Sequence, residues 1–104
     1  MIVRKVTLKL KANVAQEFKG MLEGKILPLL RKQKGFKDEL TCLAPSGTDV
    51  FAITMWDQKE NAELYNRDTY PQIVKDLEKF VEGTPQVQTF EVAHTTLGKV
   101  PAAV

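Results

Sequence analysis

The sequence is poor in the residues that build disulfides and metal sites. Among its 104 residues there is one cysteine, Cys42, and one histidine, His94. A disulfide within the chain is therefore excluded, and the cysteine and histidine clusters typical of zinc sites are absent. A single cysteine is typical of proteins of the reducing cytoplasm. We therefore expect no metal site and a cytoplasmic location.

Long apolar runs and a large charge of one sign are also missing. No run approaches the ~20 apolar residues that a membrane-spanning helix needs. The formal net charge is only +2, and basic residues alternate with acidic ones along the chain. The first residues, MIVRKVTLKLK, lack the positive-then-apolar order of a signal peptide. These features argue against a nucleic-acid partner and against a membrane partner.

Length and composition predict one globular domain, 1–104. Hydrophobic residues make up 43% of the chain, which is ordinary for a folded protein, and no linker or repeat divides it. We expect a thin core spanning 2–96, because a domain of this size buries a limited share of its surface. The tail, 97–104, is expected to be weakly ordered or bound to a partner.

Alternation of apolar and polar residues predicts the strands. The turn sequence PSGT at 45–48 joins two of them as a hairpin. The segment that follows this turn is apolar on both faces, so we expect it to be central in a sheet. The four predicted strands are 2–10, 36–44, 49–56 and 86–96.

A first helix is predicted between the first two strands. Asn13 offers a side-chain oxygen as its N-cap, and Gly35 provides a left-handed stop. Pro28 lies inside this helix and cannot donate a hydrogen bond to the carbonyl of Gly24. We therefore expect a kink or a break there.

A second helix is predicted between the third and fourth strands. Asp57 and Glu60 form a capping pair at its start. Pro71 should interrupt it, since proline fits the first turn of a new helix. A stripe of apolar residues at helical spacing continues to Val81, and we expect Gly83 to end the helix.

The predicted order is βαββαβ, the ferredoxin-like α+β plan, with a four-stranded antiparallel sheet and two helices on one face. Two helices cover only one face of such a sheet. Apolar residues of the central strand would then be exposed on the other face, and packing against a second copy is the simplest way to bury them. The sequence therefore predicts a homodimer.

On this element order and two segments, the sequence resembles the antibiotic biosynthesis monooxygenase-like proteins of the dimeric α+β barrel superfamily. The segments are LRKQKGFKDEL at 30–40 and ITMWDQKENAELYNRDTYPQIVKDL at 53–77. The resemblance covers about 2–96 and implies a dimeric barrel that binds a small aromatic molecule. It also implies a cofactor-independent monooxygenase, although members of the family also include haem-degrading enzymes and proteins with no assigned reaction.

The haem-degrading branch fits this sequence poorly. The resemblance implies an asparagine, a tryptophan and a histidine at positions that Val6, Tyr65 and Lys75 occupy here. Val6 cannot form a hydrogen bond, and Lys75 is a poor axial ligand at neutral pH. We therefore expect no haem and no other cofactor.

The resemblance implies Asn, Trp, Tyr and Arg side chains around a cavity between sheet and helices. His94 is the predicted general base, because only its unperturbed pKa lies near neutrality. The candidate substrate-binding residues are Trp56, Tyr65, Asn66, Arg67 and Tyr70.

Each candidate also has a structural interpretation. His94 would lie at a strand end near the sheet edge or a dimer contact, and Trp56 would be a core residue. Tyr65 and Tyr70 are five residues apart and project at different angles unless the break at Pro71 realigns them. Asn66 and its neighbours before the break would cap the next helix, and Arg67 would be solvated.

Two other residues are expected to be structural. Arg4 shares its strand face with apolar residues, so its charge needs a partner; it either enters the cavity or lies in water at the strand start, and we favour the second. Cys42 is expected to be a small core residue. The competing function is a non-catalytic barrel that binds a ligand or acts structurally.

Overall fold

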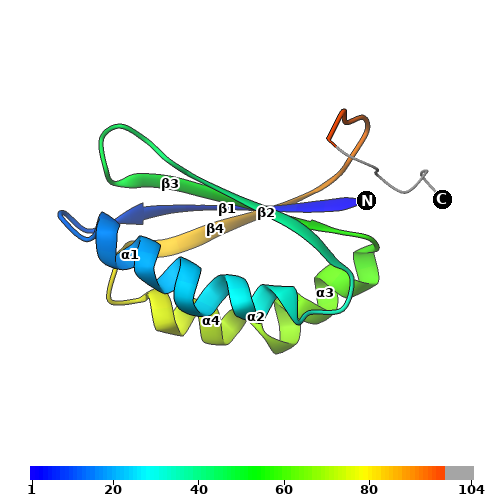
Figure 1. The fold of residues 1–104 in the computed structure, drawn as a ribbon, viewed down its shortest axis with the longest axis horizontal. Helices are drawn as coiled ribbons and strands as arrows, with labels where there is room; N and C mark the ends of the chain where they lie inside the picture. Colours follow the sequence, from blue (N-terminus) through cyan, green and yellow to red (C-terminus); the bar gives the residue numbers. More distant parts are fainter. Residues whose placement is uncertain (98–104) are drawn as a thin grey trace.

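One antiparallel sheet carries all the helices on a single face (Figure 1). The computed structural model describes residues 1–97, and the remainder of the predicted tail lies outside the described residues. The order of strands is β2-β3-β1-β4, so β3 is central as predicted, and the ferredoxin-like α+β class is confirmed. The strands are β1 (Ile2–Leu10), β2 (Phe36–Leu43), β3 (Asp49–Trp56) and β4 (Val81–Glu91).

The first helical segment runs without a gap through three pieces. These are α1 (Ala15–Met21), the π-helical η1 (Leu22–Ile26) and α2 (Leu27–Arg31). Pro28 stands in the first turn of α2, directly after the π-helical turn, where its missing N–H is tolerated. In place of the predicted kink or break, a π-helical turn precedes Pro28 and the helix continues through it.

The predicted capping by Asn13 is wrong. Val14 precedes α1, and no side chain caps the helix. Asn13 instead adopts the left-handed backbone region, with φ +63°, which asparagine tolerates better than most residues. Asn13 therefore turns the chain from β1 toward α1, and its side chain does not cap the helix.

The second helical segment is divided as predicted at Pro71. Its pieces are α3 (Lys59–Asp68) and α4 (Tyr70–Leu77), and Thr69 between them has φ −119°. The capping pair at its start is wrong, because Gln58 precedes α3 without a side-chain cap. Asp57 Oδ1 instead accepts a hydrogen bond from Asn61 Nδ2 at 2.8 Å.

The end of this helix and the start of the last strand were also mispredicted. α4 ends at Leu77, and β4 already begins at Val81, which pairs with Leu10. Gly83 lies within β4 at φ +73°, where the register between β1 and β4 shifts. The helical stripe was misleading because Phe80 and Val81 are buried in the core after the helix has ended.

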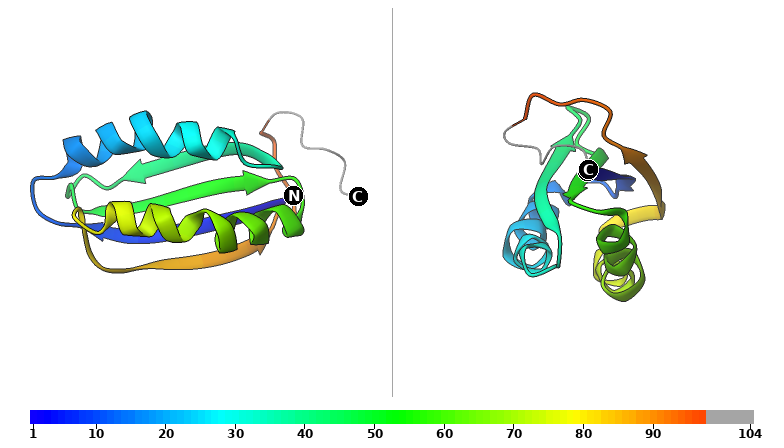
Figure 2. Two further views of the ribbon diagram at one scale, coloured as in Figure 1. Left: turned by 90° about the horizontal axis from the view of Figure 1, so that it is seen from below. Right: turned by 90° about the vertical axis from the view of Figure 1, so that its right-hand side faces the viewer.

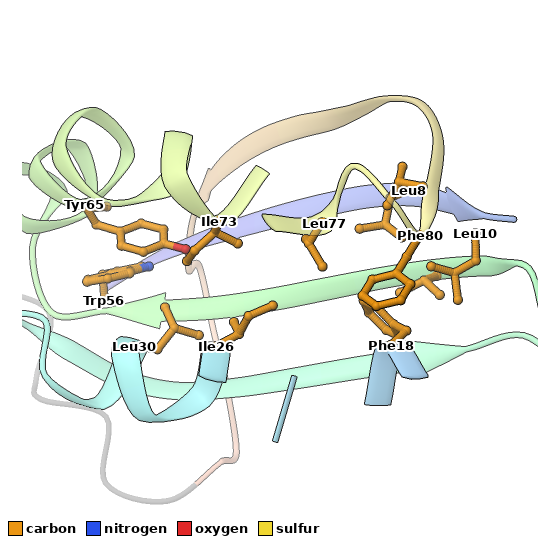
Figure 3. Close-up of a cluster of buried hydrophobic side chains, with 13 residues drawn as sticks. Leu8, Leu10, Phe18, Ile26, Leu30, Trp56, Tyr65, Ile73, Leu77 and Phe80 are labelled. Carbon is orange, nitrogen blue, oxygen red and sulfur yellow. The ribbon is translucent and has the colours of Figure 1, made fainter. Parts of the chain in front are cut away.

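The two helical segments lie side by side against one face of the sheet (Figure 2), and the hydrophobic core lies between them and the sheet. In Figure 3, Phe18 and Phe80 lie at one end of this layer, and Trp56 with Tyr65 lies at the other. The even-numbered residues of β1 face the helices, as the alternation predicted. Among residues 1–97, no helix combines the length and apolar character needed to cross a membrane.

The opposite face of the sheet carries none of the helices formed by residues 1–97 and is partly apolar. Leu40 on β2, Phe51 on β3 and Phe90 on β4 are 50%, 36% and 49% exposed. Cys42 pairs with Phe51 in the ladder. Since directly paired residues share a face of the sheet, Cys42 also lies on this open face. The expectation that Cys42 belongs to the core is therefore wrong.

We predict that Gly35→Ala will destabilise the fold by about 2–4 kcal/mol. Gly35 has φ +80°, and an added Cβ would lie 2.7 Å from the Asn61 Cβ and overlap the Asp57 carboxylate. Gly20→Ala is the matched control, because an added Cβ there meets nothing within 4 Å. It should gain about 0.5–1 kcal/mol of helix stability. Urea unfolding measures both, and equal effects would contradict the prediction.

Candidate functional site

The guanidinium of Arg4 lies at the centre of the candidate site. Arg4 is only 2% exposed and lines the cavity, so the favoured expectation that it lies in water is wrong and the alternative, entry into the cavity, is correct. Its Nη2 donates a hydrogen bond to Asn66 Oδ1 at 2.7 Å. Its Cζ lies 4.5 Å from the ring centroid of Tyr70 and 5.1 Å from that of Tyr65. Arg4 lies on the side of β1 that faces the helices, and α3 packs over this strand. Together these two features bury the charge.

All these contacts to Arg4 come from neutral groups. Among residues 1–97, Arg4 forms no ion pair with a carboxylate. Burial lowers the pKa of Arg4, and the electrostatic effect of Tyr65 and Tyr70 offsets this only in part. Because a buried charge without a counter-ion is costly, this position favours a bound anion.

A cavity of about 50 Å³ lies between the sheet and the helices. It has room for a few water molecules. It is smaller than the roughly 150 Å³ that has been found to hold a benzene molecule in another protein. Most of its lining is aliphatic, from β1, η1 and α4. The polar side chains of the lining are Arg4, Glu39, Thr41, Thr54, Tyr65 and Tyr70.

The two tyrosines present their hydroxyl groups as donors at neutral pH. Burial raises the pKa of Tyr65 to about 12, with the charge of Arg4 opposing the rise. Burial also raises the pKa of Tyr70. Their ring centroids are 6.1 Å apart. The break between α3 and α4 therefore brings both rings to the same guanidinium, although they are five residues apart.

Trp56 supports Tyr65 from the sheet. It is fully buried, and its Nε1 donates a hydrogen bond to Thr54 Oγ1 at 2.9 Å. Its ring centroid lies 4.8 Å from that of Tyr65, and the two rings lie against each other in Figure 3. Trp56 is not among the residues that line the cavity, so it acts on the cavity through Tyr65.

Glu39 is a half-buried carboxylate in the cavity lining. In the sheet it pairs with Thr54, which in turn pairs with Arg4. Burial raises the pKa of Glu39, and a hydrogen bond from the Thr41 hydroxyl opposes this rise. Sequence reasoning missed Glu39. The alternation of Glu39 and Leu40 along β2 showed that the two side chains point to opposite faces of the sheet. Which of them faces the helices depended on the register between strands, which the sequence does not give.

The remaining predicted residues lie outside the cavity. Asn66 is exposed and contacts the cavity only through Arg4. Arg67 is also exposed, and its Nε pairs with Asp68 Oδ1 at 2.7 Å. His94 is exposed and follows β4, on a segment that runs away from the helical layer (Figure 1). The role of His94 as a base therefore stays a prediction.

A larger groove of about 310 Å³ lies between α3 and β4, next to Arg4. Lys59 and Glu63 line it from α3, and Val87 and Thr89 line it from β4. Arg4 borders both the groove and the internal cavity. The Arg4–Asn66 pair therefore lies where a ligand in the groove would meet the cavity.

Metal binding has no obvious place in this site. Within the part of the chain that the structure describes, no three His, Cys, Asp or Glu side chains are grouped so that they could hold a metal ion. Lys75, considered above as a haem ligand, is exposed on α4. The chemistry available to the site is that of one cation, one carboxylate and two phenols.

Comparisons with known proteins show a well-defined structural relationship. No family model matches the sequence, and no curated protein matches it. A structure from Deinococcus radiodurans, assigned as an antibiotic biosynthesis monooxygenase, is similar with a TM-score of 0.75 and 17% identity. The alignment covers 91% of this chain and 95% of that one.

Two Streptomyces structures are similar to the same degree. One is a monooxygenase, ActVA-Orf6 of Streptomyces coelicolor, in complex with nanaomycin D, with a TM-score of 0.74, 16% identity and coverage of 94% and 92%. The other is a variant of SnoaB, a cofactor-independent oxygenase of Streptomyces nogalater, with a TM-score of 0.74, 14% identity and coverage of 93% and 98%. At these identities the comparison shows the fold, which is that of the antibiotic biosynthesis monooxygenase structures.

We predict that Arg4→Met will not destabilise the protein by more than about 1 kcal/mol. The lowered pKa of Arg4 means that folding disfavours its charged form, so an apolar chain of similar length should be tolerated. Asn66 is exposed and can bond to water instead. Thermal and urea unfolding measure the change. A loss of 3 kcal/mol or more, which is about what breaking a buried pair costs, would show that Arg4 is retained for stability.

Proposed function

We propose that this chain is a cofactor-independent oxygenase that binds a small aromatic molecule with an ionisable hydroxyl or enol group. The observation that carries the proposal is the buried Arg4 guanidinium, which lies against two tyrosine rings and is paired with no carboxylate among residues 1–97. A phenolate or enolate would supply the missing negative charge.

The chemistry follows from stabilising that anion. A substrate with an acidic C–H beside a carbonyl loses a proton, and its electron pair spreads onto the carbonyl oxygen. Arg4 and the tyrosine hydroxyls would stabilise the oxyanion in a site from which water is largely excluded. The carbanion can then transfer an electron to dioxygen. One oxygen atom enters the product as a new carbonyl, and the other leaves as water with two hydrogens of the substrate.

The size of the site limits how the substrate can bind. The internal cavity of about 50 Å³ is too small for an aromatic ring, whereas the adjoining groove of about 310 Å³ is not. We propose that the ring system occupies the groove and that its oxygen reaches Arg4 when the exposed Asn66 side chain turns aside. Tyr70 is half-buried at the start of α4 and can also move.

The small cavity also favours a second candidate function. If Arg4 and its neighbours do not open, the site admits only a few water molecules, and the protein is a non-catalytic barrel. In that case a ligand would bind in the groove or at a partner surface without reaction. The structures with bound nanaomycin D and with cofactor-independent oxygenase activity support the catalytic proposal for this fold.

We further propose that the open sheet face pairs with a second copy of the chain. Its apolar side chains on β2, β3 and β4 are partly exposed. Water-exposed apolar patches of this kind are typical of interaction surfaces. A face shared by two identical copies would form a two-fold dimer and a closed barrel.

The oxygenase proposal predicts oxygen uptake with anthrone or a quinol and no added metal or flavin. Arg4→Met should lower kcat/KM at least 100-fold, because an oxyanion-stabilising group is typically worth 10²–10³. Lys75→Met is the matched control, since it removes an exposed cation of α4 that lines neither the groove nor the cavity. It should change kcat/KM less than about threefold. Wild-type protein that consumes no oxygen would favour the non-catalytic barrel.

The dimer proposal predicts a sedimenting species of twice the 11.7 kDa chain mass at micromolar concentration. Phe90→Lys should shift it to the monomer, because it places a charge in the proposed apolar interface. Leu64→Lys changes an exposed leucine on α3, outside the sheet, and should leave the dimer intact. A wild-type monomer at this concentration would contradict the proposal.

A further inference from the structure

We propose that Glu39 is the general base that deprotonates the substrate opposite Arg4; this inference rests on the proposed oxygenase function. The proton would pass from the acidic C–H or O–H of the substrate to the Glu39 carboxylate. The electron pair that remains on the substrate would be held as an oxyanion at Arg4. Dioxygen is the oxidant, and Glu39 returns the proton to the departing water.

The sheet register places Glu39 in a suitable position. Thr54 on β3 is paired on one side with Glu39 on β2 and on the other with Arg4 on β1. With strands about 4.8 Å apart, the backbones at Glu39 and Arg4 are separated by about 10 Å. With the ring in the groove and its oxygen at Arg4, one water molecule in the internal cavity would span the remaining distance and carry the proton to Glu39. Among residues 1–97, Glu39 is the only carboxylate in the cavity lining.

Only one of the two oxygens of the Glu39 carboxylate accepts a hydrogen bond from residues 1–97. Thr41 Oγ1 donates a hydrogen bond to Glu39 Oε2. Within residues 1–97, no side chain or backbone N–H donates to Oε1, which leaves this oxygen free to accept a proton. Glu39 and Thr41 are two residues apart on β2, so both side chains lie on the helix-facing side of the sheet.

The surroundings of Glu39 make its carboxylate a stronger base than a carboxylate in water. Burial raises the pKa of Glu39, and the neighbouring Asp38 charge raises it further, against the effect of the Thr41 hydroxyl. Tyr65 faces Glu39 from α3, and the charges of Glu39 and Arg4 act on the Tyr65 hydroxyl with opposite sign. From η1 and α2, the cavity is lined by the apolar Ile26 and Leu30.

Glu39→Gln is the decisive variant. It should lower kcat for oxygen uptake with anthrone by about 10²–10⁴, the usual contribution of a general base. Its activity should recover as pH is raised, because the substrate then ionises without help. Its melting temperature should be unchanged or higher, since folding disfavours the charged form of Glu39. Binding of para-nitrophenolate, which needs no deprotonation, should change less than threefold.

Two controls separate this inference from its alternatives. Glu17→Gln removes an exposed carboxylate on α1 that does not line the cavity, and it should leave kcat unchanged. His94→Ala tests the base predicted from sequence. A full loss of kcat in His94→Ala with activity retained in Glu39→Gln would overturn the assignment to Glu39.

The outcomes also distinguish this inference from the proposed function. Wild-type turnover that survives Glu39→Gln within threefold overturns the role of Glu39 and leaves the oxygenase proposal standing. A wild-type protein that neither binds para-nitrophenolate nor consumes oxygen overturns both. Weak para-nitrophenolate binding in Arg4→Met, with normal binding in Glu39→Gln, supports the division of roles between the two residues.

Discussion

The buried guanidinium of Arg4 constrains the whole candidate site. A charge that is 2% exposed must be satisfied by its immediate surroundings. Here these are the Asn66 oxygen and the faces of Tyr65 and Tyr70. The contacts hold α3 and the start of α4 against β1 and set the spacing of the two phenols. Because every one of these partners is neutral, the positive charge is still available to an anionic ligand.

The interruption between α3 and α4 makes this arrangement possible. In an unbroken helix, residues five apart point in different directions. Thr69, with φ −119°, and Pro71 after it redirect the chain, and both tyrosine rings then meet Arg4. The π-helical turn before Pro28 has a comparable role in the other helical segment, since it accommodates a proline while the helix continues along the cavity. Both interruptions shape the cavity walls.

Local chemistry explains which predictions from sequence were correct. Period-two alternation located β1, and the apolar run after the turn at 45–48 located β3. The interruption at Pro71 was also correct, because a missing N–H acts within one turn of helix. The errors arose where tertiary contacts compete with local preference. Phe80 and Val81 continue a helical stripe in sequence but belong to a turn and a strand, since pairing of Val81 with Leu10 ends the helix early.

The sequence by itself determined the element order, the ferredoxin-like class, and the tyrosines Tyr65 and Tyr70 of the cavity. Only the tertiary structure decided that Arg4 is buried, that Glu39 faces it across β3, and that Trp56 lies behind Tyr65. The physical reason is that alternation assigns residues to the two faces of one strand. Which face the helices cover, and which residues of neighbouring strands are aligned, depends on register and packing between distant segments.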